Sequence, residues 1–330
     1  MDNNEIKFCC SRPFTAVEID DKGDVYTCCP VFINFYRIGN IFESKIEDIW
    51  YSKEATELRK KILKGDYSIC NKEICRSCTI VEKESPKLSL KPDFPVQISL
   101  AYDRECNLQC ITCRDNKYKN SKFLYKKYND IIDKTLIPFA KNAKIIQLNG
   151  TGEALYSAHS RFLIKRLADE NKNLKFGINT NGILFNKKNL ELLGINGRVK
   201  YVYVSLPALN PKIYNQIMIG GDLNTVVKNI KWMAEEHKKR IEQVTINFVT
   251  SNLNYTEIPK LINFAKKLDI YIDVFPFINW HTKFGENGEW NIWEKSNKNY
   301  ENFVKILRSS PSYDKLQLPA LFNDIKNGNV

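Results

Sequence analysis

Short apolar runs alternate with amphipathic segments along the middle of the chain. Runs rich in β-branched and aromatic residues predict strands, whereas apolar residues spaced three and four apart predict helices. Strands are predicted at Val96–Ala101, Ile145–Leu148, Leu174–Ile178, Val199–Leu206, Val244–Val249 and Ile270–Phe275. Helices are predicted at Tyr125–Ala140, Arg161–Asn171, Thr225–Lys238 and Thr256–Leu268. This alternation indicates an α/β fold with a parallel sheet, either an open doubly wound sheet or an incomplete barrel.

The first part of the chain has a different pattern. Two short strands flank the turn at Asp20–Asp24, and a helix is predicted from the N-cap Ser52 to Leu63. An α+β module of this size has a thin core and usually needs metal or disulfides. We therefore divide the chain into a cysteine-rich module (1–82), a proline-containing linker (83–95), the α/β domain (96–278) and a capping segment (279–330).

The capping segment carries three tryptophans, Trp280, Trp290 and Trp293, followed by a helical pattern at Tyr300–Leu307. We expect the segment to close one end of the sheet or to cover the site. Its tryptophans would then form an aromatic floor for a sugar or a small ring, or pack the tail against the sheet.

Composition excludes several classes of protein. The 330 residues are 43% hydrophobic, and no apolar run approaches the ~18 residues that span a membrane. The polar, acidic start at Met1–Glu5 lacks the features of a signal peptide, so a cytoplasmic protein is expected. The net charge of +12 comes from basic residues interleaved with acidic ones, and no nucleic-acid-binding motif is present, so a nucleic-acid partner is not expected.

All ten cysteines lie in the first 113 residues. In a reducing compartment, this number points to metal or cluster ligands instead of disulfides. Three of them, Cys106, Cys110 and Cys113, form a C-x3-C-x2-C motif directly after the first predicted strand of the sheet. Three thiolates on one loop can hold three corners of an iron–sulfur cubane and leave one iron open for a ligand. A structural zinc site, the alternative, normally takes four protein ligands.

With this motif, residues 94–276 resemble the radical S-adenosylmethionine (SAM) enzymes, which implies a partial (β/α)6 TIM-like barrel. The resemblance implies a SAM-binding [4Fe-4S] cluster on the three cysteines. It also implies SAM contacts at the carboxyl ends of successive strands. These contacts are assigned to Gly150, Thr151, Gly152, Glu153, Asn179, Thr180, Ser205, Asn247 and Phe275. The sequence departs from the common pattern at Thr112, often aromatic in the family, and at Met218, where many relatives have an arginine.

The N-terminal module carries the motifs Gly23-x4-Cys28-Cys29-Pro30 and Cys70-x4-Cys75-x2-Cys78. With these motifs it resembles a SPASM or twitch module, which implies an auxiliary iron–sulfur cluster. Its pattern best fits ligation by Cys10, Cys28, Cys70 and Cys75, with Cys29 and Cys78 as alternates. The seven cysteines outside the C-x3-C-x2-C motif suffice for one fully ligated auxiliary [4Fe-4S] cluster. They suffice for two such clusters only if one iron has no cysteine ligand. A zinc site remains the alternative, because Cys75 and Cys78 also have knuckle spacing.

The resemblance implies an enzyme that reductively cleaves SAM and uses the 5′-deoxyadenosyl radical to abstract a substrate hydrogen atom. A low-potential donor such as flavodoxin or ferredoxin would supply the electron. Oxidative modification of a peptide is the first expectation for the function. Dehydrogenation or epimerisation of a sugar, nucleotide or other small metabolite is the second. A non-catalytic iron–sulfur or zinc scaffold that binds nucleic acid is the rival from another class. The identity of the catalytic residues stays open.

Overall fold

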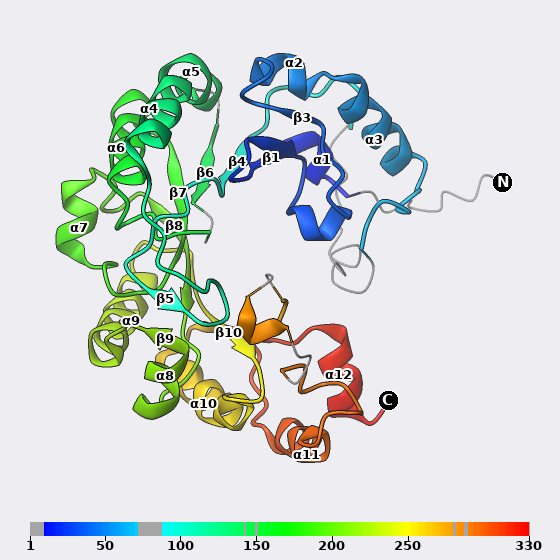
Figure 1. Ribbon diagram of the computed structural model, residues 1–330, viewed down its shortest axis with the longest axis vertical. Coiled ribbons are helices and arrows are strands. Elements are labelled where there is room, and N and C mark those ends of the chain that lie inside the picture. Colours follow the sequence, from blue (N-terminus) through cyan, green and yellow to red (C-terminus); the bar gives the residue numbers. More distant parts are fainter. Residues whose placement is uncertain are drawn as a thin grey trace. The chain divides into compact units, whose positions relative to one another are not determined.

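The computed structural model describes residues 10–71, 88–141, 143–148, 151–279, 282–286 and 290–329. They form two compact units, each built from several chain segments (Figure 1). The first unit comprises residues 1–104, 120–151 and 162–175, and the second comprises residues 105–119, 152–161 and 176–330.

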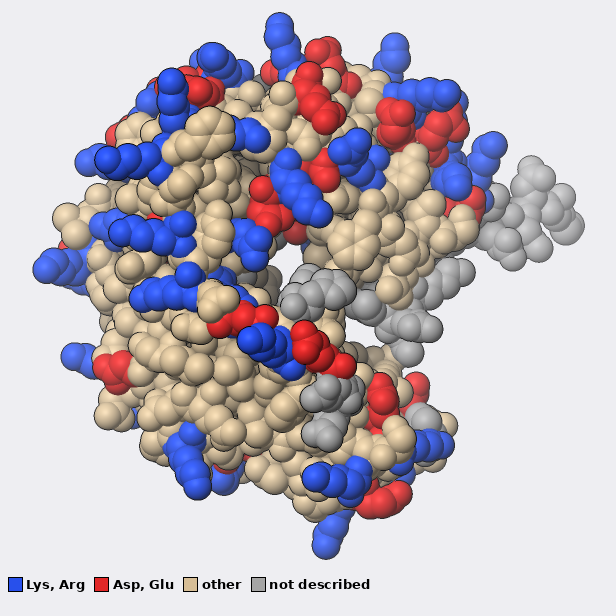
Figure 2. Space-filling view, viewed as in Figure 1, with Lys and Arg blue, Asp and Glu red and all other residues tan. Residues whose placement is uncertain are grey.

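Charged side chains of both signs are mixed on the surface. On the face drawn in Figure 2, Lys and Arg are interspersed with Asp and Glu and are not gathered into one field. Many of the charged residues pair within one helix, as Lys60 does with Glu57 at 2.8 Å and Lys238 with Glu235 at 3.3 Å. None of the helices in the described ranges combines the length and the apolar character needed to cross a membrane.

The first unit contains a sheet in the order β6-β4-β1-β2-β3. Its strands are β1 (Ala16–Ile19), β2 (Asp24–Tyr26), β3 (Gly39–Asn40), β4 (Gln97–Leu100) and β6 (Ile145–Leu148). Strand β2 pairs antiparallel with both β1 and β3, whereas β1 runs parallel to β4, with Ala16 opposite Gln97 and Ile19 opposite Leu100. The cysteine-rich module therefore continues the same sheet as β4 and covers the edge of that strand.

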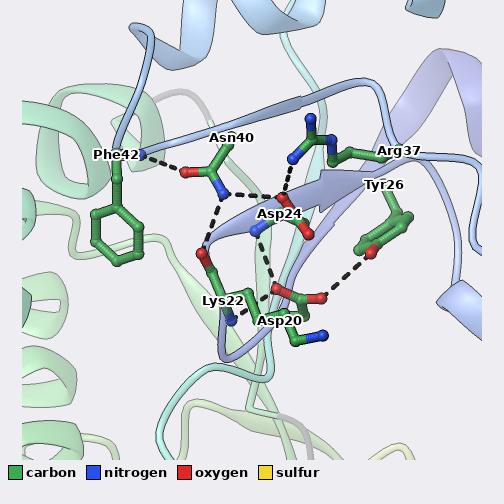
Figure 3. Close-up of polar contacts among 7 residues, drawn as sticks. All are labelled: Asp20, Lys22, Asp24, Tyr26, Arg37, Asn40 and Phe42. Atoms are coloured by element: carbon green, nitrogen blue, oxygen red, sulfur yellow. Dashed lines mark hydrogen bonds and ion pairs between the residues drawn. The ribbon is translucent and has the colours of Figure 1, made fainter.

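A polar network holds the turn between β1 and β2 (Figure 3). Asp20 Oδ1 accepts hydrogen bonds from the backbone amides of Lys22 and Asp24, both at 2.9 Å, and the Tyr26 hydroxyl donates to Asp20 Oδ2 at 3.2 Å. Asn40 Nδ2 donates to Asp24 Oδ1 at 2.8 Å and to the Lys22 carbonyl at 3.0 Å. Side-chain to backbone bonds of this kind fix turns where little apolar surface is available.

This part of the chain also carries several helices. They are α1 (Arg12–Thr15), α2 (Ile46–Trp50), α3 (Lys53–Leu63), α4 (Lys122–Ile131), α5 (Ile137–Ala140) and α6 (Ala158–Glu170), with a 3₁₀ turn η1 (Pro30–Ile33) and a π-helical turn η3 (Ile132–Leu136). Helix α3 starts at its predicted cap, because Ser52 Oγ accepts the Ala55 amide at 3.1 Å. Its buried Arg59 donates to the carbonyls of Pro13 and Trp50 and lies over the Trp50 ring at 4.1 Å.

The second unit contains a parallel sheet in the order β12-β11-β10-β8-β7. Its strands are β7 (Lys175–Thr180), β8 (Val199–Ser205), β10 (Gln243–Thr250), β11 (Tyr271–Pro276) and β12 (Leu316–Gln317). Its helices are α7 (Lys187–Leu192), α8 (Pro211–Ile217), α9 (Leu223–His237), α10 (Ile258–Leu268), α11 (Tyr300–Ser309) and α12 (Ala320–Asn327), with 3₁₀ turns η4 (Tyr255–Glu257) and η5 (Lys283–Gly285). Helices α9 and α10 pack on β10 and β11, respectively.

The two faces of this sheet differ in polarity. Val202 and Val204 on β8 and Ile246 and Phe248 on β10 are buried on the helix-covered face. Residues between them along the strands point to the other face. That face carries polar side chains near the carboxyl ends of the strands, so a site is expected there in a parallel α/β fold.

The predicted α/β class with a parallel, partial-barrel sheet is confirmed, and all six predicted strands are present. The structure adds the short strand β12, which pairs with β11 and comes from the capping segment. It also adds helices α7, α8 and α12 and a two-stranded antiparallel ribbon of β5 (Gln109–Cys110) and β9 (Met218–Ile219). In the capping segment, Trp290 stacks on Phe284 with ring centroids 3.8 Å apart, and Trp293 packs against Phe322. These contacts favour packing of the tail; Trp280 lies outside the described residues.

Candidate functional site

The C-x3-C-x2-C loop is a compact turn at the start of the second unit. The Leu108 amide donates to Cys106 Sγ at 3.4 Å, and the amides of Cys113 and Arg114 both donate to the Cys110 carbonyl at 3.0 Å. The Arg114 guanidinium donates to Cys113 Sγ at 3.4 Å. The loop thus supplies two of its three sulfurs, those of Cys106 and Cys113, with N–H donors.

Burial and mutual repulsion make free thiolates unfavourable on this loop. Burial raises the pKa of Cys106, and it raises the pKa of Cys110 to about 12 together with the negative charges of Cys113 and Cys106. A metal ion bound to the sulfurs offsets the cost of burial and the repulsion between thiolates, because its positive charge stabilises the deprotonated form of a coordinating thiol. This donor set fits an iron–sulfur cluster, whose irons take cysteine thiolates as ligands.

The loop is tied to the carboxyl end of β7. Asn181, directly after that strand, donates through Nδ2 to Asn107 Oδ1 at 2.8 Å, and its Nδ2 lies 4.0 Å from Cys106 Sγ. Asn181 in turn donates its backbone amide to Glu153 Oε2 at 2.8 Å. The cysteine loop and Glu153 therefore meet at a single residue at the strand end.

Glu153 is a buried carboxylate that holds this strand end. It is 1% exposed, and the Thr180 hydroxyl donates to both of its oxygens, at 2.9 and 3.1 Å. Burial raises the pKa of Glu153 to about 7 against the opposing effect of these hydrogen bonds. Its amide also donates to the Glu105 carbonyl at 2.9 Å, which links it to the beginning of the cysteine loop. Glu153 and Thr180 are thus engaged with each other, and their side chains position the loop.

A row of polar side chains crosses the open face of the second unit's sheet. Ser205, Asn247 and Asp273 are direct partners in the registers of β8, β10 and β11, and adjacent strands lie about 4.8 Å apart. Ser205 is exposed, and Asn247 is partly buried with its Oδ1 unpaired among the described residues. Phe275, two residues after Asp273 on the same face, is also exposed. The predicted contacts Ser205, Asn247 and Phe275 therefore share one accessible face.

The remaining predicted SAM contacts are placed differently. The Thr151 hydroxyl is engaged with the carbonyls of Ala101 and Asp103. Gly152 and Asn179 are partly buried, and Asn179 lies opposite Tyr203 in the register of β7 and β8. Gly150 lies outside the described residues. Among the described residues of this turn, the backbone of Thr151 and Gly152 can still contact a ligand.

Sequence reasoning missed Asp273, although an acidic residue in the apolar run Ile270–Phe275 was a signal. Asp273 is 8% exposed, its Oδ1 has no hydrogen-bond partner among the described residues, and burial raises its pKa to about 6.

The described cysteines of the N-terminal module border two small apolar clusters. Cys10 and Cys70 pack on the cluster of Phe14, Leu58 and Ile62, and Cys28 belongs to the cluster of Tyr26 and Ile33. Tyr36 packs against both clusters. Burial raises the pKa of Cys29, the neighbouring alternate ligand, to about 12. Cys75 and Cys78 lie outside the described residues.

Two family models match the chain. The iron–sulfur cluster-binding domain SPASM matches residues 9–79, and the Radical SAM superfamily matches residues 103–265. The chain belongs to the radical SAM superfamily. The two matches bear out the resemblances drawn from the cysteine loop and from the N-terminal module, and membership implies SAM and [4Fe-4S] clusters as cofactors. The SPASM match precedes the radical SAM match along the chain.

Curated relatives in this superfamily carry enzyme names, in agreement with the predicted class. A probable GTP 3′,8-cyclase of Methanocaldococcus jannaschii is 27% identical over 185 residues, covering 55% of this chain and 58% of the relative. The GTP 3′,8-cyclase of Aliarcobacter butzleri is 25% identical over 241 residues, covering 70% and 69%. The chain thus matches little more than half the length of the first of these relatives.

Among solved structures, SuiB of Streptococcus suis aligns over 92% of this chain and 69% of its own, with 18% identity and a TM-score of 0.44.

Proposed function

We propose that this chain is a radical SAM enzyme that cleaves SAM reductively and abstracts a hydrogen atom from a substrate. Cys106, Cys110 and Cys113 would hold the [4Fe-4S] cluster at which SAM is cleaved. The observation that carries the proposal is the joining of the cysteine loop to the strand end through Asn181 and Glu153. When bound, the cluster supplies the electron that breaks the sulfonium C5′–S bond of SAM, and a flavodoxin or ferredoxin would deliver that electron.

The chain's own residues bind and orient. The backbone at Gly150–Gly152 can approach the amino group of SAM closely because two of its three residues are glycines. Ser205 and Asn247 offer polar atoms for the adenosine on the open sheet face, and Phe275 offers an apolar ring. Glu153 and Thr180 hold the strand end in place, which is a positioning role. In this proposal the N-terminal module holds an auxiliary [4Fe-4S] cluster on Cys10, Cys28, Cys70 and Cys75, with Cys29 and Cys78 as alternates.

The substrate proposed here is a peptide that is modified oxidatively. The N-terminal iron–sulfur module supports this choice, since an auxiliary cluster can accept the electron that an oxidative outcome releases. The names of the curated relatives favour a nucleotide as the second candidate.

The catalytic step is tested on anaerobically reconstituted protein with SAM and dithionite, by measuring 5′-deoxyadenosine together with iron and sulfide per chain. The unmodified protein should form 5′-deoxyadenosine. Cys106→Ala, Cys110→Ala and Cys113→Ala should each abolish it while the cysteines of the N-terminal module keep their iron, which shows that the variants are folded. Retained cleavage in all three variants would refute the assignment of this loop.

The substrate is tested by deuterium transfer into 5′-deoxyadenosine. Deuterated cell extract is divided into a peptide fraction and a small-molecule filtrate, and deuterated GTP is assayed beside them. The peptide proposal predicts transfer from the peptide fraction that disappears after protease treatment. Transfer from GTP or from the filtrate alone would instead establish the nucleotide or another small metabolite.

A further inference from the structure

Tyr214 is a wholly buried tyrosine whose hydroxyl has no hydrogen-bond partner among the described residues. It lies on α8, and its side chain is 0% exposed. A phenolic O–H that is removed from water without a partner costs free energy, so buried tyrosines normally point their hydroxyl at an acceptor. The structure therefore provides a donor that lacks its acceptor.

The segment around this hydroxyl is the one that pairs with the cysteine loop. Helix α8 leads directly into β9, where Met218 is the register partner of Cys110, and the Met218 Sδ lies 3.3 Å from Cys110 Sγ. A Cβ at Gly221 would lie 2.7 Å from the Tyr214 hydroxyl and 2.9 Å from the Met218 carbonyl oxygen. The hydroxyl is thus beside the backbone that holds Cys110, and only glycine leaves room for it there.

Two oxygen acceptors in this segment already accept hydrogen bonds from other groups. The Met218 carbonyl accepts the Gly221 amide at 2.8 Å. The Asp222 carboxylate accepts the amide and the hydroxyl of Thr225, at 3.1 and 2.6 Å. Burial, and then the negative charges of Cys110 and Asp222, raise the pKa of Tyr214, so the hydroxyl keeps its proton.

We propose that the Tyr214 hydroxyl donates a hydrogen bond to sulfur at the Cys110 corner of the SAM-binding cluster and thereby raises the reduction potential of that cluster. Hydrogen bonds to the sulfurs are one of the factors that set the potential of an iron–sulfur cluster. The reduced cluster carries one more negative charge, so a donor beside its sulfur stabilises the reduced form more than the oxidised form. Met218 contributes an apolar thioether at the same corner and brings no charge. The inference rests on the function proposed above and gives Tyr214 the role of tuning the reduction potential of that cluster.

The test is a redox titration of the anaerobically reconstituted full-length protein, followed by electron paramagnetic resonance with and without SAM. SAM perturbs the signal of the cluster with the open iron and so separates it from an auxiliary cluster. Tyr214→Phe removes only the hydroxyl and keeps the ring in its pocket. We expect the midpoint potential of the SAM-responsive cluster to fall, with about a tenfold smaller ratio of reduced to oxidised cluster at a fixed potential, or ~59 mV for a one-electron couple.

The matched control is Tyr313→Phe. The Tyr313 hydroxyl donates to the Ile270 carbonyl at 2.9 Å, at the amino end of β11, away from the carboxyl ends where the cysteine loop is tied. This variant should leave the potential unchanged. An equal shift in both variants would mean that the loss of any tyrosine hydroxyl alters the protein in general, and it would overturn the inference.

A second measurement keeps the inference testable if Tyr214→Phe does not take up iron. 3-Fluorotyrosine incorporated at position 214 keeps the hydroxyl and makes it a stronger donor, so the midpoint potential should rise. An unchanged potential in a protein that holds its iron would overturn the inference. If the protein forms 5′-deoxyadenosine but the midpoint potential of its SAM-responsive cluster does not change on substitution of Tyr214, this inference alone is refuted. A protein with no SAM-responsive cluster refutes the proposed function as well.

Discussion

Replacement of Asp273 by asparagine should stabilise the protein, and the gain should grow with pH. Asp273 is 8% exposed on β11, and its Oδ1 has no partner among the described residues. Burial disfavours its charged form and raises its pKa from the usual 3.8 to about 6. The neighbouring Asn247 Oδ1 is also unpaired, so the new amide of Asp273→Asn finds an acceptor next to it.

The magnitude follows from the pKa of Asp273. A difference of roughly 2 units between folded and unfolded protein corresponds to about 3 kcal/mol, at 1.36 kcal/mol per unit. Because the folded-state pKa is raised, the native state holds the proton more tightly than the unfolded chain. The stability of the unmodified protein is therefore greatest below pH 3.8, falls as the pH rises through the window to about 6, and is constant above it. Roughly half of this loss develops between pH 5 and 8.

Anaerobic thermal melting from pH 5 to pH 8 measures the effect. At pH 8 the Asp273→Asn protein should melt about 6 °C above the unmodified protein, with a smaller difference at pH 5. Asp130→Asn, which removes an exposed carboxylate from α4, is the matched control and should leave the melting temperature unchanged. A variant that is no more stable at pH 8, or a difference that is the same at every pH, would refute the reasoning.

Two further substitutions test the packing described above. Glu153→Ala leaves the Thr180 hydroxyl and the Asn181 amide without their buried acceptor and should cost about 2–4 kcal/mol, measured by denaturant unfolding; a loss below ~1 kcal/mol would contradict the role given to this carboxylate. Arg59→Met keeps much of the side-chain volume but leaves the carbonyls of Pro13 and Trp50 without their donors. It should lower the free energy of unfolding by about 2–4 kcal/mol. Limited proteolysis should then cut the N-terminal module first. An unchanged rate of cleavage there would contradict a stabilising role of Arg59 in the module.

The regular strands of the barrel domain could be predicted because each needs only a local signal. β6 coincides with the predicted run Ile145–Leu148, since four apolar or β-compatible residues are bounded by polar ones. Short elements carry no such signal, as the ribbon of β5 and β9 shows, with two residues in each strand. Helix α8 is also short, but Asn210 caps it and Pro211 follows at the first helical position. This pair is a start signal that could have been used.

Some residues of the candidate site can likewise be predicted from the sequence, and others cannot. The three cysteines of the loop are recognised by their spacing, which is a property of the chain itself. The bond between Glu153 and Asn181 joins residues 28 positions apart in sequence, and it depends on where two loops end in space. Asp273 and Tyr214 matter because of partners they lack, and burial without a partner is visible only in three dimensions.

The parallel pairing of β1 with β4 has a consequence for synthesis on the ribosome. Strand β1 cannot pair with β4 until Gln97, the register partner of Ala16, has been synthesised 81 residues later. At roughly 5–20 residues per second, this delay lasts on the order of 4–16 s. During this interval the hairpin of β1 and β2 presents an open edge to other chains. The polar network includes Asp20 and Asp24 of that hairpin and Asn40 of β3, and it can hold the turn before β4 emerges. We therefore expect weakening of this network to lower the yield of nascent chains more than it lowers the stability of the finished protein.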